Sequence, residues 1–102
     1  IRSIEEADVE IGKFIDKMKQ EDLYDDTHFM FLTDHGGIGN GHGGVSTDEM
    51  IVPWGITGPG IVKGLKITEP NNTVNTAAVI LHLFKVKQPL SWVGEIPKSI
   101  FK

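Results

Sequence analysis

Glycine is concentrated in residues 34–46 (DHGGIGNGHGGVS), which hold six of the twelve glycines and two of the four histidines. Glycine loses more backbone freedom on folding than any other residue, so this density argues against a helix or strand interior and predicts a loop. The stretch follows residues 28–33 (HFMFLT), an almost continuous apolar run that is typical of a strand buried on both faces. We therefore expect a glycine-rich loop immediately after a buried strand.

Upstream of this strand, the sequence predicts one amphipathic helix. Ser3 and Glu6 form a capping-box pattern, so the helix is expected to begin at Ile4. Lys17 and Lys19 fall in its last turn, where cations complement the helix dipole. Apolar residues recur with helical spacing, which predicts one buried face consisting of Ile4, Ala7, Ile11, Phe14, Ile15 and Met18.

Downstream of the loop, shorter elements are expected. Ser46 and Glu49 can cap a short helical turn. Residues 51–57 are predicted as a strand in which Pro53 indicates an edge or a bulge, and residues 62–67 as a weak strand. An irregular, packed tail should close the chain. Asn75 is expected to cap a last helix over residues 76–84, whose buried side would be Ala77, Ile80, Leu81 and Phe84. This alternation predicts an α/β layer arrangement in one unit.

Composition excludes several classes of function. The net charge is −4, and no basic run is interleaved with aromatic residues, so binding to a nucleic acid backbone is not expected. The chain has no cysteine, which excludes thiolate metal sites, disulfides and cysteine nucleophiles. No apolar stretch approaches the roughly 18 residues that a membrane span requires.

Three side chains of the glycine-rich loop are candidate metal ligands: Asp34, His35 and His42. A carboxylate and two imidazoles, without sulfur, suit a hard or borderline divalent cation. In open α/β sheets, sites gather beyond the carboxyl ends of strands, which is where this loop begins. Composition alone leaves another interpretation open, in which Asp34 caps a turn and both histidines are solvated.

The same loop also contains G-x-G-x-x-G at residues 39–44, the pattern of a dinucleotide-binding turn. That turn should open a long helix directly after its strand. Here the pattern lies several residues beyond the strand, and only a short segment separates it from Pro53. Asp34 would also repel a pyrophosphate. The sequence therefore disfavours a nucleotide cofactor.

Several motifs in order resemble the C-terminal metal-binding half of the alkaline phosphatase superfamily, in particular its type I phosphodiesterases, nucleotide pyrophosphatases and related phosphatases. The motifs are Thr33-Asp34-His35-Gly36-Gly37, Gly41-His42-Gly43-Gly44, Ile51-Val52-Pro53-Trp54 and Gly58-Pro59-Gly60-Ile61-Val62-Lys63-Gly64. The resemblance implies an alkaline phosphatase-like α/β fold, with a larger mixed or parallel sheet flanked by helices. Residues 1–102 would form the C-terminal portion of its catalytic domain.

The resemblance also implies roles for the three candidate ligands. Asp34 and His35 would bind the metal that activates a Thr or Ser nucleophile, and His42 would bind a second metal. Zinc is the first expectation for both ions, and manganese is the alternative. His82 is the other downstream candidate, but it falls within the last helix and is interpreted as structural, as is His28.

The family's nucleophile and remaining metal ligands would lie upstream, so the rest of the parent chain would be needed and this fragment alone should be inactive. The parent is expected to hydrolyse small-molecule phosphate mono- or diesters. Sulfatase and phosphomutase chemistry are alternatives within the superfamily, and a non-catalytic metal-binding remnant is an alternative of a different functional class. Sulfatases that resemble this stretch usually carry a lysine soon after the histidine, and residues 43–50 contain none.

Overall fold

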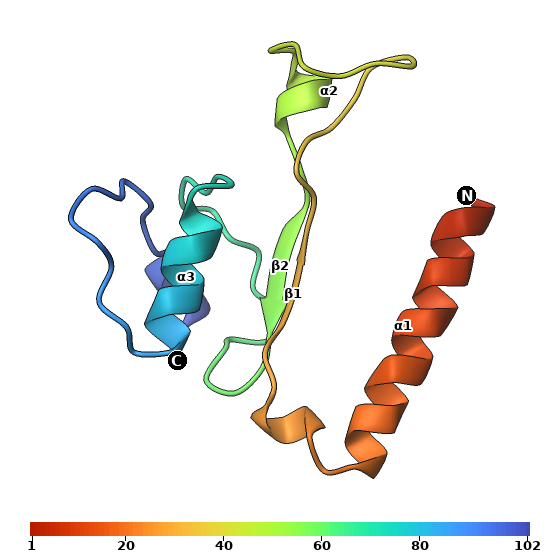
Figure 1. Ribbon diagram of the computed structural model, residues 1–102, viewed down its shortest axis with the longest axis vertical. Coiled ribbons are helices and arrows are strands. Elements are labelled where there is room, and N and C mark those ends of the chain that lie inside the picture. The colour runs from red at the N-terminus through yellow and green to blue at the C-terminus, as the bar shows by residue number, and fades with distance from the viewer.

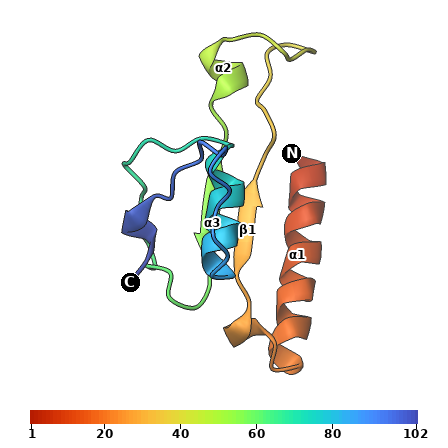
Figure 2. The same ribbon diagram turned by 60° about the vertical axis from the view of Figure 1, so that its left-hand side comes forward.

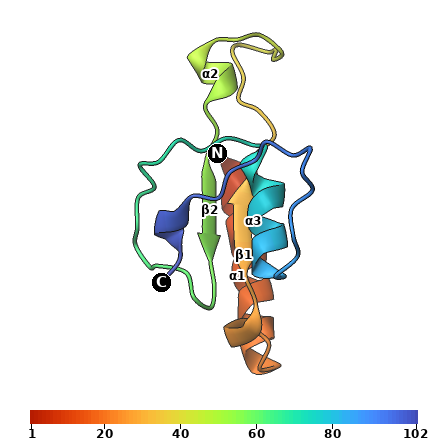
Figure 3. The same ribbon diagram turned by 90° about the vertical axis from the view of Figure 1, so that its left-hand side faces the viewer.

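The computed structural model describes all residues from 1 to 102, arranged as helices on both sides of a small sheet (Figure 1). Helix α1 and helix α3 lie on opposite faces of the two strands, which is clearest when the molecule is turned (Figure 3). The elements in chain order are α1 (Arg2–Gln20), the 3-10 turn η1 (Tyr24–Asp26), β1 (Phe29–Leu32), α2 (Thr47–Met50), β2 (Trp54–Thr57), α3 (Asn75–Leu83) and the 3-10 turn η2 (Lys98–Ile100).

Strands β1 and β2 form a two-stranded antiparallel sheet whose register pairs Phe29 with Thr57 and Leu32 with Trp54. The predicted α/β class is therefore observed on a small scale, consistent with part of an alkaline phosphatase-like fold, but the strand pair is not parallel. The prediction that β1 is buried on both faces is wrong, since Phe31 is 61% exposed. The second strand begins at Trp54 rather than at residue 51, because Pro53 has no N–H for the ladder.

Helix α1 begins at Arg2, and no side chain caps it, so the predicted start at Ile4 with a Ser3 cap is wrong. The Glu6 carboxylate instead accepts a hydrogen bond from the Arg2 guanidinium at 2.9 Å. The predicted apolar face exists but is largely uncovered, with Ile4 74% exposed. The helix touches the sheet through Phe14, whose ring meets that of Phe29 edge to face at 6.4 Å.

The core lies around α3 and the tail, and it consists of few side chains. The buried apolar residues are Ile61, Ala78, Val79 and Ile100. The predicted buried side of α3 is therefore wrong: Ala77 and Ile80 are exposed, and Phe84 is 75% exposed. Helical rotation by about 100° per residue separates the two faces, and the tail packs on the Ala78 face rather than the Ala77 face.

The prediction that Asn75 caps α3 from the preceding position is wrong, because Asn75 is the first residue of the helix and is buried. Its side-chain oxygen accepts a hydrogen bond from the N–H of Glu95 at 2.9 Å, which ties the tail to the helix. Residues 62–67 form no strand. Ile61 instead makes an isolated bridge with Phe101. The tail is irregular, as expected, but only part of it is packed, since Ile100 is buried whereas Leu90 and Val93 are 99% and 83% exposed.

None of the helices is both long enough and apolar enough to cross a membrane. The segment between β1 and β2 leaves the end of the sheet and extends away from both large helices (Figure 2). We refer to residues 34–53 as the glycine-rich arm.

Candidate metal site

The glycine-rich arm is held together mainly by its own backbone. Its outgoing part is bonded to α2 through Gly36 N–H to Glu49 O at 2.8 Å and through Gly37 N–H to Asp48 O at 3.0 Å. A Cβ atom at Gly36 would collide with the carbonyl oxygen of Asp48. Glycine is therefore required where the chain passes α2.

The predicted cap of α2 is confirmed as a complete capping box between Ser46 and Glu49. The Glu49 carboxylate accepts hydrogen bonds from the Ser46 hydroxyl at 2.6 Å and from the Gly44 N–H at 2.8 Å. These two bonds, first that of Ser46 and then that of Gly44, lower the pKa of Glu49 below its ordinary value. Glu49 thus fixes the segment that follows His42, a role beyond the helix cap that sequence reasoning assigned to it.

A tight turn at the tip of the arm brings the two histidines together. Ile38 and Gly41 exchange both backbone hydrogen bonds, at 3.0 and 3.1 Å, around Gly39 with φ of 58°. A positive φ at the first central residue is the type II′ hairpin geometry. Continuing this pairing makes His42 the neighbour of Gly37 and the diagonal neighbour of His35 on one face. The imidazoles stack there, with ring centroids 4.0 Å apart and planes inclined by 27°.

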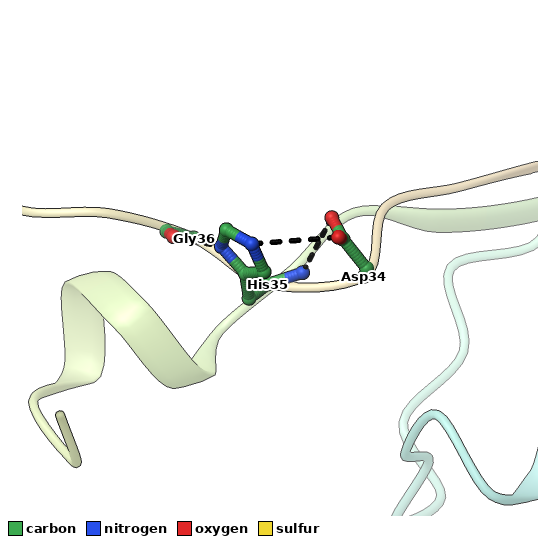
Figure 4. Close-up of polar contacts among 3 residues, drawn as sticks. All are labelled: Asp34, His35 and Gly36. Carbon is green, nitrogen blue, oxygen red and sulfur yellow. Dashed lines mark hydrogen bonds and ion pairs between the residues drawn. The ribbon is translucent and has the colours of Figure 1, made fainter. Parts of the chain in front are cut away.

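Asp34 and His35 form the base of the arm, directly after β1, as predicted (Figure 4). Asp34 Oδ1 accepts a hydrogen bond from the His35 N–H at 3.0 Å. The pKa of Asp34 is lowered below its ordinary value. The largest cause is the hydrogen bond from the His35 N–H, followed by a bond from Asp34's own backbone and then by the nearby His35 imidazole. Asp34 is therefore a carboxylate at neutral pH, and its side chain is 85% exposed.

The tautomer of His35 follows from its partners. Its Nδ1 lies 2.7 Å from the carbonyl oxygen of Gly36, and since a carbonyl only accepts, Nδ1 must carry the donated proton. In the neutral imidazole the lone pair is then on Nε2, which faces Asp34 Oδ2 at 3.4 Å (Figure 4). Two acceptors that face each other can be bridged by a proton on Nε2, by a water that donates to both, or by a cation.

The spacing of these two atoms fits a shared cation. Ligand atoms at about 2.0–2.1 Å from a tetrahedral zinc ion are roughly 3.4 Å apart, since the angle between them is near 109°. A direct charge-assisted N–H···O bond would be shorter, at about 2.7–2.9 Å. The donor set of one carboxylate oxygen and one imidazole nitrogen therefore fits a divalent metal.

His42 does not complete a three-ligand cluster with this pair, and no group of three or more His, Asp or Glu side chains has metal-binding spacing. The stacking explains this absence, because imidazole lone pairs lie in the ring plane and near-parallel stacked rings do not aim at one point. His42 thus lies beside the Asp34–His35 pair, but its ring nitrogens do not point to the position between Asp34 Oδ2 and His35 Nε2.

Comparison with known proteins identifies the family. The family model for Sulfatase matches residues 1–86, which include α1, the sheet, the glycine-rich arm and α3. This chain belongs to the sulfatase family. That family is part of the alkaline phosphatase superfamily and its members are hydrolytic enzymes, so the superfamily expected from the motifs is confirmed. No curated protein and no solved structure matches the chain.

The two other histidines of this sulfatase-family chain lie in structural contacts. His28 donates from Nε2 to the Pro59 carbonyl oxygen at 2.8 Å, which braces the turn after β2. The His82 ring packs against Phe101 at 4.7 Å between centroids. Both placements agree with the structural roles expected from the sequence.

Proposed function

We propose that this chain is the C-terminal portion of an alkaline phosphatase-like catalytic domain that hydrolyses phosphate mono- or diesters with the help of divalent metal ions. The single observation that carries the proposal is the pair of facing acceptors, Asp34 Oδ2 and His35 Nε2, separated by 3.4 Å. Both atoms are held by neighbouring backbone groups, so the pair is oriented before any ligand binds.

The residues for metal binding follow from this geometry. Asp34 and His35 would hold one ion and His42 would contribute to a second, with zinc the first choice and manganese the alternative. A bound pair of such ions supplies positive charge that lowers the pKa of a hydroxyl nucleophile and stabilises charge on the ester oxygens. A catalytic zinc takes about three protein ligands, so three side chains cannot complete two sites. The remaining ligands and the Thr or Ser nucleophile belong to the rest of the parent protein.

Within this arrangement, the chain's own residues orient the side chains that would bind metal. The Gly36 carbonyl fixes the His35 tautomer, and the His35 N–H keeps the Asp34 carboxylate turned toward Nε2. The Glu49 capping box fixes the chain that carries His42. These contacts hold the ligand atoms in place, which limits the entropy that metal binding must overcome.

The choice of phosphate over sulfate esters rests on the sequence. No lysine occurs in residues 43–50, the segment in which sulfatases similar to this stretch usually carry one. Sulfate ester hydrolysis is the second candidate, favoured by the description of the family whose model matches. The two candidates predict opposite preferences between substrates with the same leaving group.

The decisive experiment uses the intact parent protein with an aryl phosphate, an aryl phosphodiester and an aryl sulfate. We expect turnover of at least one phosphate ester that is lost on chelation and restored by zinc or manganese. A clear preference for the sulfate would select the second candidate. Activity that resists chelation would refute the metal assignment, and the absence of any turnover together with tight metal binding would favour a non-catalytic remnant.

A further inference from the structure

A small polar pocket lies at the end of the sheet that is remote from the glycine-rich arm. There the 3-10 turn η1, which precedes β1, comes beside the turn that follows β2 (Figure 1). The volume of the pocket is about 230 Å³, which suits a small ion with some of its water rather than a larger organic ligand. We call it the η1 pocket. Its charged lining residues are Asp25, Lys63 and Lys102, and the hydroxyls of Tyr24 and Thr57 add further polar groups.

The strand register separates the η1 pocket from the candidate metal pair. Phe29 and Thr57, which line the pocket, pair with each other at one end of the sheet. Asp34 follows the opposite end, where Leu32 pairs with Trp54. The strand from Phe29 to Leu32 alone spans roughly 10 Å, at about 3.3 Å per residue. A small ion in the pocket is therefore out of reach of the metal pair.

Two ammonium groups in the η1 pocket have no carboxylate partner. Lys63 and Lys102 line the pocket, and the ion pairs of the chain all join other residues. Lys102 is held at the wall, because its N–H donates to the Gly60 carbonyl oxygen at 2.9 Å. Asp25 is the acidic residue of the lining, and it pairs with neither lysine. The lining is therefore net positive in a chain whose net charge is −4, and it attracts an anion.

The turn after β2 adds a neutral donor. Its Ile61 N–H bonds to the Gly58 carbonyl oxygen at 3.2 Å, and Gly60 has φ of 73°, as in a type II turn. The Pro59 carbonyl oxygen accepts from His28 at 2.8 Å, and His28 is outside the lining of the η1 pocket. The C=O and N–H of one trans peptide point in opposite directions, so the Gly60 N–H points away from His28. It bonds to no other backbone group and can donate to a ligand.

The Asp25 carboxylate decides which anion fits. A carboxylate accepts hydrogen bonds and donates none. Sulfate is fully deprotonated at neutral pH, so it would place an acceptor against this acceptor. Inorganic phosphate keeps a P–O–H group in both of its forms near neutral pH. It can therefore donate to Asp25 while its other oxygens accept from Lys63 and Lys102.

We propose that the η1 pocket is a binding site for inorganic phosphate. Lys63, Lys102 and the Gly60 N–H bind the unprotonated oxygens, and Asp25 accepts from the P–O–H group and so selects phosphate over sulfate. The inference does not depend on which ester the parent protein hydrolyses, since the pocket is formed outside the glycine-rich arm.

The test measures acetylation of individual lysines by mass spectrometry in the intact parent protein. Sodium phosphate and sodium sulfate are compared at constant ionic strength in sodium chloride, after chelation, so that no metal-bound anion contributes. We expect phosphate to slow the acetylation of Lys63 and Lys102 several-fold, and sulfate to have little effect. Lys13 is the control lysine, because it pairs with Glu10 on α1 and should react equally in both salts.

Asp25→Asn tests the selectivity for phosphate. The amide can donate to sulfate, so sulfate should now protect Lys63 and Lys102 as well. The ratio of the dissociation constants of sulfate and phosphate should fall about tenfold, the effect of one hydrogen bond to a charged group. Asp26→Asn is the matched control, because Asp26 is also exposed and lies outside the lining of the η1 pocket. It removes the same charge but should keep the selectivity.

Two results would overturn the assignment. One is equal protection of Lys63 and Lys102 by phosphate and sulfate in the wild type, and the other is no protection by phosphate. A loss of selectivity in Asp26→Asn as large as in Asp25→Asn would also contradict it. Lysine protection is measured without turnover, so the η1 pocket can fail while the proposed hydrolysis stands, and the reverse.

Discussion

The glycine-rich arm and the body formed by α3 and the tail are stabilised in different ways. In the arm, all of these bonds join residues of the arm itself, as in the Ser46–Glu49 capping box, the Ile38–Gly41 turn and the Gly36–Glu49 bond. In the body, Asn75 bonds to Glu95, and Ile61 pairs with Phe101, across much longer separations. The arm buries no side chain, whereas the body contains the buried residues. The site is therefore shaped by local backbone bonds, and the stability of the molecule comes from elsewhere.

The largest expected effect is on turnover of the parent protein. His35→Ala and Asp34→Ala should each reduce kcat/KM for a phosphate ester by about a thousandfold or more, since the nucleophile would lose the ion that lowers its pKa. Their effect on the midpoint of urea unfolding should be small, because both side chains are exposed. Turnover that survives both substitutions would break the link between the arm and catalysis.

His42→Ala provides the matched comparison within the arm. It removes the stacking partner of His35 but keeps both side chains of the Asp34–His35 pair, so it should impair turnover less than His35→Ala does. Metal content measured for both variants separates the two sites. An equal loss of all metal in His35→Ala and His42→Ala would show that the histidines serve one ion.

The isolated chain should bind zinc weakly and show no phosphatase turnover. Two ligands at one site and one at another leave each ion short of its coordination set. Zinc affinity measured by competition with a chelator checks the first part, and an assay with an aryl phosphate checks the second. Turnover by a pure sample that His35→Ala abolishes would mean that these residues suffice.

In the body, Ile100→Ala should lower the free energy of unfolding by about 2–5 kcal/mol, because it empties space in a core of few side chains. Val93→Ala is the control, since Val93 is 83% exposed and a surface change costs within about 0.5 kcal/mol. Urea unfolding followed by tryptophan fluorescence gives both values. If Ile100→Ala also changed zinc affinity strongly, the arm would not be independent of the body.

The smallest expected effect is the pH dependence of the capping box. The pKa of Glu49 is lowered in the folded chain. Its contribution to the stability of the capping box is therefore present above the pKa that Glu49 has in the unfolded chain, and it is lost as pH falls through the pKa of the folded chain. Exchange of the Gly44 amide should become several-fold faster over that acidic range. Glu49→Gln should remove this pH dependence. The same pH dependence in Glu49→Gln as in the wild type would contradict the assignment.

The sequence by itself determined the arm. Glycine density, the Ser46 and Glu49 spacing and the Asp34-His35 pair after an apolar run all act over a few residues, so their consequences could be predicted. The structure was needed to show that a local turn at Gly39 brings His42 beside His35. Only the tertiary structure decided that β1 and β2 pair antiparallel. It also decided which face of α3 is buried. Both Ala77 and Ala78 suit a helix interior, and the choice between them depends on where a tail some twenty residues away along the chain packs.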